Sequence, residues 1–263
     1  MQRSTICRVA VMLIAIFVVA SRAPAISAQE GATNWYCIRN KDHAQPILDN
    51  TLSVIKGHNC IYVDSGRDEG DKVLYLTFDA GYENGNIAAI LDTLKESDVK
   101  GSFFVLGNLI SRNPELIRRM VADGHLVCNH TYSHHDMSAI TDFDDFANEL
   151  NKLNDAFISL CGRELDKFYR PPEGRFSITN LKHAEQLGYT TVFWSFAYAD
   201  WDNKKQPDAQ KALKLILNNI HNGAVILLHP TSATNAQILE ELISRLREEG
   251  FRFGTLDEIT SRA

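Results

Sequence analysis

The sequence predicts an α/β fold, a distorted parallel barrel of the (β/α)7 type with about seven βα units and an N-terminal extension. From residue 72 onward, short apolar runs alternate with amphipathic runs, which is the order of βα units. The apolar runs are nearly continuous, as expected for strands buried on both faces. Polar residues follow several of them, where a barrel places its functional groups. A doubly wound open sheet is the alternative.

The first elements alternate a strand with a helix. The apolar run 73–78 predicts a buried strand, and apolar residues at positions i, i+3, i+4 and i+7 from Ile87 predict a helix over 86–97. The run 102–106 predicts the next strand. A helix is expected over 114–122 because proline, which is favoured at the first helical position, stands at its start.

The same alternation continues to the end of the chain. Short apolar or aromatic runs predict strands over 126–128, 167–169, 190–194, 224–228 and 251–253. Amphipathic runs predict helices over 143–161, 177–187, 208–221 and 234–249, with a short helix from Leu256. The region from 29 to 70 has no strong periodicity, and we expect it to wrap the barrel as an extension.

The N-terminus has the pattern of a secretory signal peptide. Arg3 and Arg8 precede the apolar run 9–20, and small residues follow it. The run is short for a helix that spans a bilayer, so cleavage near Ala25 or Ala28 is expected and no membrane span afterwards. We therefore expect the protein to be secreted, or to act in the cell envelope outside the cytoplasmic membrane.

Composition restricts the class of partner. The chain is 44% hydrophobic and 23% charged, which suits one large globular domain once the signal peptide is removed. Its formal net charge of -6 argues against nucleic acid, because phosphate binding needs a basic surface. We expect a monomer.

Cysteine usage leaves several pairings open. Of the five cysteines, Cys7 lies in the signal peptide, which leaves an even number. A bridge between Cys37 and Cys60 is possible because both flank the extended N-terminal segment. Cys128, in a predicted buried strand, is at least as easily an unpaired core residue as a partner of Cys161 in a second bridge.

Two histidines four residues apart are the strongest chemical signal. On one helical turn, His130 and His134 would lie on the same side and could hold one divalent ion. Either histidine alone is more simply explained as a polar loop residue, but the pair after a predicted strand favours a metal site. His135 is taken as a neighbour, since adjacent residues diverge on a helix.

Other polar residues follow other predicted strands. Asp79 could be a general base, a metal ligand or a helix cap, and Arg170 could orient a carboxylate or lie on the surface. Asp200 behind His229 could raise the pKa of that imidazole and keep it ready to donate a proton. Trp201 could belong to the core or offer a flat face to a sugar ring.

These segments, in this order, resemble the polysaccharide deacetylase family, carbohydrate esterase family 4, whose catalytic part is the NodB-homology domain. The resemblance covers residue 72 to the C-terminus and rests on Thr77-Phe78-Asp79-Ala80-Gly81, His130 to His134, Arg170-Pro171-Pro172-Glu173-Gly174, Asp200-Trp201 and Leu227-Leu228-His229. We therefore divide the chain into a signal peptide (1–28), an extension (29–70) and a NodB-homology domain (71–263).

The resemblance implies a role for each site residue. It assigns catalysis to Asp79, Arg170, Asp200 and His229, metal binding to His130 and His134, and substrate contacts to Glu173, Trp201 and the acetyl-pocket residue Leu227. In this assignment Asp79 is the general base that Arg170 orients, and His229 is the general acid that Asp200 supports. The backbone N–H of Glu173 would help to bind the oxyanion.

One position departs from the family pattern. The second aspartate of the first motif, the family's third metal ligand, is Ala80 here. A methyl group cannot coordinate, so we expect weaker binding of the implied divalent ion, zinc or another transition metal, or another oxygen ligand. Asp79, Glu83, Asn84 and water are the candidates.

The alanine form of this motif resembles the PdaA-type branch, as do Asn129, the segment 194–198 and the segment 40–43. That resemblance implies peptidoglycan glycan strands as the partner and removal of the N-acetyl group from N-acetylmuramic acid, the step before muramic δ-lactam formation in spore cortex. The alternatives are a deacetylase of N-acetylglucosamine in chitin-like or peptidoglycan glycan, and a wall-binding module without catalysis, which Ala80 suggests.

Overall fold

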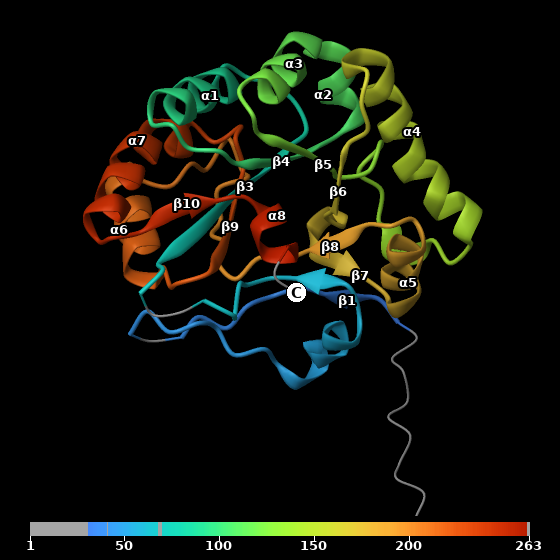
Figure 1. The fold of residues 1–263 in the computed structure, drawn as a ribbon, viewed down its shortest axis with the longest axis horizontal. Helices are drawn as coiled ribbons and strands as arrows, with labels where there is room; N and C mark the ends of the chain where they lie inside the picture. Colours follow the sequence, from blue (N-terminus) through green and yellow to red (C-terminus); the bar gives the residue numbers. More distant parts are fainter. Residues whose placement is uncertain (1–30, 41, 68–69, 262–263) are drawn as a thin grey trace, which may run out of the picture.

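A curled parallel sheet with helices on its outside forms the centre of the molecule (Figure 1). The computed structural model describes residues 31–40, 42–67 and 70–261, so the predicted signal peptide lies outside the described residues. The strands of the main sheet are β2 (Cys60–Ile61), β3 (Val73–Ala80), β4 (Ser102–Val105), β5 (Leu126–Asn129), β6 (Asp166–Tyr169), β8 (Thr190–Val192), β9 (Ala224–Leu228) and β10 (Arg252–Gly254).

The strand order makes β3 the central strand. One edge of β3 pairs with β9, and its other edge pairs with β10 near its start and with β4 near its end. The sheet continues through β5, β6 and β8 to β2. Beyond β8, Phe196 forms an isolated parallel bridge with Ile226 of β9. The predicted distorted barrel is thus confirmed as a half-barrel.

Helices cover the outer face of this sheet (Figure 1). They are α1 (Asn86–Glu96), α2 (Gly107–Arg112), α3 (Pro114–Ala122), α4 (Phe143–Cys161), α5 (Ile178–Gln186), α6 (Ala209–Asn219) and α7 (Ala233–Glu248), whereas the short α8 (Leu256–Thr260) packs on the inner side of the sheet. The predicted helices agree with these to within a few residues, whereas α2 was not predicted. Among the described helices, none is both long enough and apolar enough to cross a membrane.

Alternation along β3 separates two cores. Leu74, Leu76 and Phe78 face the helices, while Val73 and Tyr75 face the inside of the half-barrel. The inner core takes one or two side chains from each of the other main-sheet strands except β10, and α8 inserts a leucine into it. Because successive side chains of a strand point to opposite faces, Thr77 and Asp79, which continue the inner series beyond Tyr75, also point inward.

The N-terminal extension has two short strands that pair with strands of the remaining chain. Its first strand, β1 (Thr33–Asn34), pairs antiparallel with β7 (Arg175–Phe176), and β2 extends the main sheet beside β8. A 3-10 helix (Asn50–Gly57) lies between β1 and β2. These strands have two residues each, too few for a periodic signal, so the sequence did not predict them.

The predicted Cys37–Cys60 bridge is wrong. Both thiols are free, as are those of Cys128 and Cys161. Cys60 instead packs against the apolar cluster around Trp35, and burial raises the pKa of its thiol to about 12. Cys128 is an unpaired core residue of β5, in agreement with one of the two readings above.

Gly223, directly before β9, is hydrogen-bonded both to the extension and to the first residue of β3. Its N–H donates to the carbonyl of Val73, its carbonyl accepts from the N–H of Asp64, and its φ is +76°. A Cβ at Gly223 would lie 2.1 Å from the Asp64 carbonyl oxygen. The position therefore requires glycine for both its conformation and its space.

We predict that Gly223→Ala lowers the free energy of unfolding by about 3 kcal/mol or more, because left-handed strain adds to a backbone clash. Gly188→Ala is the matched control: Gly188 also has a positive φ, but its Cβ would meet nothing within 4 Å. That control should cost only about 1 kcal/mol. Urea unfolding of both variants measures the difference, and equal losses would contradict the argument from the clash.

Candidate active site

A fully buried arginine holds the predicted base. Arg170, which directly follows β6, is 0% exposed, and its Nη1 donates to Oδ1 of Asp79 at 2.7 Å. Its other nitrogens donate to the carbonyls of Val192 (3.1 Å) and Phe193 (3.3 Å) and to Oγ1 of Thr77 (3.0 Å). The guanidinium is thus fixed by four partners, and Asp79 accepts a hydrogen bond from one of its N–H groups.

The surroundings of Asp79 favour its ionised form. Burial raises the pKa of this carboxyl, but the charge and the hydrogen bond of the Arg170 guanidinium, together with the neighbouring imidazoles of His130 and His229, outweigh it and hold the pKa below its usual value. Since Arg170 occupies Oδ1, the second oxygen, Oδ2, is the one that can accept a proton.

His130 has a fixed tautomer. Its Nδ1 lies 2.8 Å from the carbonyl oxygen of Arg170, which can only accept, so Nδ1 carries the proton. Burial lowers the pKa of His130 to about 4, so the ring is neutral and its Nε2 has a free lone pair. That Nε2 lies 3.6 Å from Oδ2 of Asp79. The arrangement is the one that commonly prepares a histidine to bind a metal.

The predicted helical turn over the histidine pair is wrong. Residues 130–135 form a loop in which Thr131 (φ 73°) and His134 (φ 58°) are left-handed. Asn129 Oδ1 accepts from the N–H of Thr131, and Thr131 Oγ1 accepts from the N–H of His134. The two imidazoles of the pair are nevertheless close, with ring centroids 5.0 Å apart. His135 is exposed, as its predicted role as a neighbour allows.

A second buried carboxylate holds the predicted acid. Asp200 is 1% exposed, and its two oxygens accept from Nδ1 (2.7 Å) and from the backbone N–H (2.8 Å) of His229. Asn235 Nδ2 donates to the same carboxylate at 2.6 Å, and Tyr198 Oη donates to Asn235. Burial lowers the pKa of His229, but the hydrogen bond and charge of Asp200, with the charge of Asp79, outweigh it and raise that pKa.

The acid and the base stand at the ends of adjacent strands. Phe78 of β3 pairs with Leu228 of β9, so Asp79 and His229 occupy the next register position on each. Each also shifts the pKa of the other. Proton acceptor and proton donor are therefore neighbours, as the strand-end argument predicts.

Of the predicted substrate residues, Trp201 lies next to His229. Trp201 is 61% exposed, and its ring centroid lies 6.1 Å from that of His229. Leu227 is a buried residue of β9, and Glu173 is exposed with a left-handed backbone (φ 58°). Glu173 also lines a pocket of about 40 Å³ beside His134, together with Asp136, Pro172 and Arg175.

Two supporting residues were missed by the sequence reasoning. Thr77 stands two positions before Asp79, and strand alternation alone could have placed both side chains inside the half-barrel. Asn235 lies in the first turn of α7 and completes the hydrogen bonds of Asp200. It carries no recognisable signal in the sequence.

The donor set fits a metal ion only in part. Within the described ranges, no three or more His, Cys, Asp or Glu side chains are grouped so as to hold a metal. Ala80 contributes its methyl group to the apolar cluster under the helices. Glu83 Oε1 accepts from Gly85, and Asn84 is hydrogen-bonded to Asn86 and Thr231. The two imidazoles therefore suit a divalent ion, and of the three candidate third residues only Asp79, whose Oδ2 lies 3.6 Å from Nε2 of His130, stands beside the pair.

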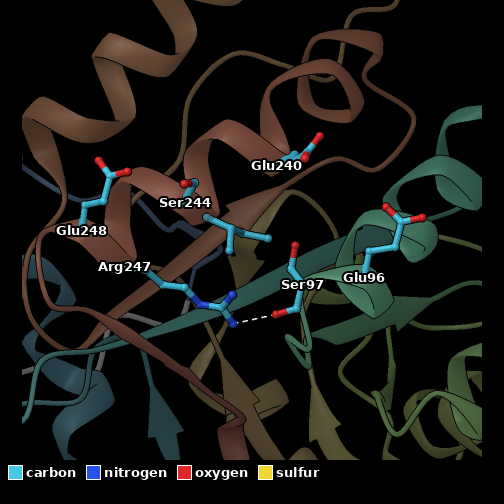
Figure 2. A pocket seen from close by; sticks show the side chains of 7 residues that line it. Glu96, Ser97, Glu240, Ser244, Arg247 and Glu248 are labelled. Carbon is cyan, nitrogen blue, oxygen red and sulfur yellow. Dashed lines mark hydrogen bonds between the residues drawn. The ribbon is translucent and has the colours of Figure 1, made fainter.

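A larger hollow lies away from these residues, on the outside of the helices. Its volume is about 530 Å³, and it is lined by Glu96, Ser97, Glu240, Ile243, Ser244, Arg247 and Glu248. Figure 2 shows it between the end of α1 and α7, where Arg247 donates to the carbonyl of Ser97 at 2.6 Å. Because it contains none of the acid–base residues, we place the active site at the strand ends.

Comparison with known proteins shows the family of this chain. A family model described as polysaccharide deacetylase matches residues 66–192. The peptidoglycan-N-acetylmuramic acid deacetylase PdaA of Bacillus subtilis is 35% identical over 93% of this chain and 92% of that protein. Its solved structure, a family 4 carbohydrate esterase, gives a TM-score of 0.83 over 89% of this chain and 98% of that chain.

Two other relatives differ in what they are named for. A peptidoglycan-N-acetylglucosamine deacetylase of Bacillus cereus is 35% identical over 69% of this chain and 66% of that protein. The structure of a pseudoenzyme of the same esterase family from Bacillus anthracis is 27% identical, with a TM-score of 0.68 over 76% of this chain and 68% of that chain.

We predict that Asp200→Asn lowers the pKa of the His229 imidazole, because the charge of Asp79 then remains as the one nearby carboxylate that opposes the effect of burial. A proton donor is active only while protonated, so activity that depends on it is lost as pH rises through this pKa. In the variant, the loss should begin at lower pH. NMR titration of His229 in both proteins measures the shift, and an unchanged or higher pKa would refute it.

Proposed function

The chain belongs to the polysaccharide deacetylase family, and we propose that it hydrolyses the N-acetyl group of N-acetylmuramic acid in peptidoglycan glycan strands. The observation that carries the proposal is the pair of buried supports, Arg170 for Asp79 and Asp200 for His229, at adjacent strand ends. The choice of sugar is supported by the similarity, along nearly the whole chain, to a relative named for that substrate.

The residues can divide the reaction between them. Oδ2 of Asp79 accepts a proton from a water molecule, whose oxygen then forms a bond to the amide carbon. The backbone N–H of Glu173 donates a hydrogen bond to the amide oxygen and so stabilises the negative charge that develops there. His229 donates its Nε2 proton to the leaving nitrogen as the carbon–nitrogen bond breaks. The products are acetate and a glycan with a free amine.

The histidine pair is the proposed holder of a metal ion. A divalent ion such as zinc would supply Lewis-acid stabilisation of the charge on the amide oxygen. His130, whose Nδ1 is committed to Arg170, and His134 would hold it. With Ala80 in place of a third donor, we propose that the ion is held more weakly than by three protein ligands.

The remaining site residues bind the sugar in this proposal. The exposed indole of Trp201 next to His229 offers a flat apolar face to a pyranose ring. Leu227 lines the space for the acetyl methyl group, which is apolar and gains from buried surroundings. The free amine produced on muramic acid would then form an amide bond with the sugar's own lactyl carboxyl group, with loss of one water molecule, which gives the muramic δ-lactam of a spore cortex.

Location follows from the substrate. Peptidoglycan lies outside the cytoplasmic membrane, and residues 1–28 have the charge and hydropathy pattern of a cleaved secretory signal. We therefore propose that the protein acts in the cell envelope as a monomer.

Two alternatives are each favoured by a specific observation. The relative from Bacillus cereus is named for N-acetylglucosamine, so this sugar is the first alternative. Ala80 and the likeness to a pseudoenzyme favour a binding module without catalysis. The second is weaker, because binding a glycan requires no ionised base and no protonated acid held by buried partners.

We predict that the purified protein releases acetate from peptide-stripped peptidoglycan faster than from chitin oligomers. Asp79→Asn and His229→Ala should each lower the rate by about 10²–10⁴-fold, the usual contribution of a general acid or base. Enzymatic determination of acetate gives both comparisons. Preference for chitin oligomers would favour the glucosamine alternative, and glycan binding without acetate release would favour the binding module.

We predict that His134→Ala weakens binding of Zn²⁺ by about tenfold or more, because it removes one of two imidazole donors. His135→Ala is the matched control, since His135 is the exposed histidine next in sequence. Isothermal titration calorimetry with Zn²⁺ alone compares the two variants. Equal affinities would mean that the pair does not hold the ion.

A further inference from the structure

The N-terminal segment is hydrogen-bonded to the loop over residues 170–176, which we call the Glu173 loop. The backbone N–H of Trp35 donates to the carbonyl of Gly174 at 2.8 Å, and its indole Nε1–H donates to the carbonyl of Trp194 at 2.9 Å. Directly before Trp35, β1 pairs with β7 at the end of this loop. Trp35 is 5% exposed, so the segment is packed against the loop as well as bonded to it.

The backbone shape of the Glu173 loop depends on its surroundings. Glu173 is left-handed, a conformation that residues other than glycine keep only when neighbouring contacts enforce it. A Cβ at Gly174 would lie 2.6 Å from Cη2 of Trp194 and 3.0 Å from Cβ of Trp35. The two tryptophans therefore enclose Gly174, and the loop has little room to relax.

Trp35 also supports the residues that hold Arg170. Its indole stacks on Phe193, with ring centroids 4.4 Å apart and an interplanar angle of 18°. The carbonyls of Phe193 and Val192 both accept from the Arg170 guanidinium, which in turn holds Asp79. Trp35 thus contacts the residue next to Glu173, the proposed oxyanion donor. It also contacts Phe193, whose carbonyl accepts from Arg170, the partner of Asp79.

We propose that Trp35 is a positioning residue for deacetylation, acting through the Glu173 loop and through Arg170. The proposal rests on the roles given above to Glu173 and Asp79. Both groups act on charge and protons that exist only in the transition state, so their displacement lowers kcat and leaves substrate binding nearly unchanged. A purely structural role would lower the amount of folded protein and leave the kcat of the folded fraction as it is.

The test compares Trp35→Ala with Leu52→Ala. Leu52 is a fully buried member of the same apolar cluster, and no hydrogen bond joins its side chain to the Glu173 loop. With peptide-stripped peptidoglycan, Trp35→Ala should lower kcat roughly tenfold or more with KM within about twofold, since even one oxyanion donor contributes about 10²–10³-fold. Leu52→Ala should leave kcat per folded molecule within about twofold.

Two further variants sharpen the comparison. Trp35→Phe keeps a ring against Phe193 and loses the indole donor, so it should recover most of the lost kcat. Tyr36→Ala removes the next aromatic residue, which is 44% exposed, and should have no effect on kcat. Equal losses in kcat from Leu52→Ala and Trp35→Ala, or a loss confined to KM, would overturn the proposal.

A measurement without substrate separates this proposal from the proposed function. Hydrogen exchange followed by mass spectrometry should show faster exchange over 170–176 in Trp35→Ala than in the wild type, with β9 unchanged. If Trp35→Ala does not fold, Trp35→Phe is measured instead and should show the same change to a smaller degree. Absence of acetate release by the wild type would refute the deacetylase function alone, whereas unchanged exchange over the loop would refute the role of Trp35.

Discussion

The charge of Arg170 inside the half-barrel is the constraint on which the rest of the site depends. A buried guanidinium costs several kcal/mol unless its N–H groups and its charge are matched. Here β3 supplies Thr77 and Asp79, and the end of β8 supplies two carbonyls. The backbone of Arg170 also takes part, since its carbonyl fixes the tautomer of His130. Arg170 therefore links the ends of four strands, β3, β5, β6 and β8, and also keeps the predicted base ionised.

The sequence predicted the positions of these groups better than their local shapes. Parallel strands end at one face, so Asp79, Arg170 and His229 could be brought together from strand ends alone. The spacing of His130 and His134 correctly predicted that their rings lie close together, but the helical turn given as the reason was wrong. A helical turn was expected, whereas left-handed residues at Thr131 and His134 produce the approach. Such a loop is stabilised by hydrogen bonds that the side chains of Asn129 and Thr131 accept from backbone N–H groups of the loop, and no periodic pattern encodes them.

Strand alternation gives Ala80 a physical meaning beyond a lost ligand. Thr77 and Asp79 point inside the half-barrel, and Ala80 packs among apolar side chains under the helices. A carboxylate in that cluster would be an unpaired buried charge, so alanine is compatible with the packing as it stands. In the proposed reaction, charge stabilisation would then depend more heavily on the backbone N–H of Glu173 and on His229. This is why the orientation of these groups, more than the number of metal donors, should limit the rate.

The same reasoning explains why the extension belongs to the catalytic unit. A half-barrel closed by an isolated bridge leaves the outer edge of β8 without a long partner strand, and exposed edges are unstable and prone to wrong pairing. The extension supplies β2 at this edge and packs Trp35 on the two residues that follow β8. Those residues are also the ones whose carbonyls and rings border Arg170 and Gly174. The same contacts therefore cover the edge of β8 and hold the Glu173 loop. A change that loosens this edge should also displace the groups proposed to act in catalysis.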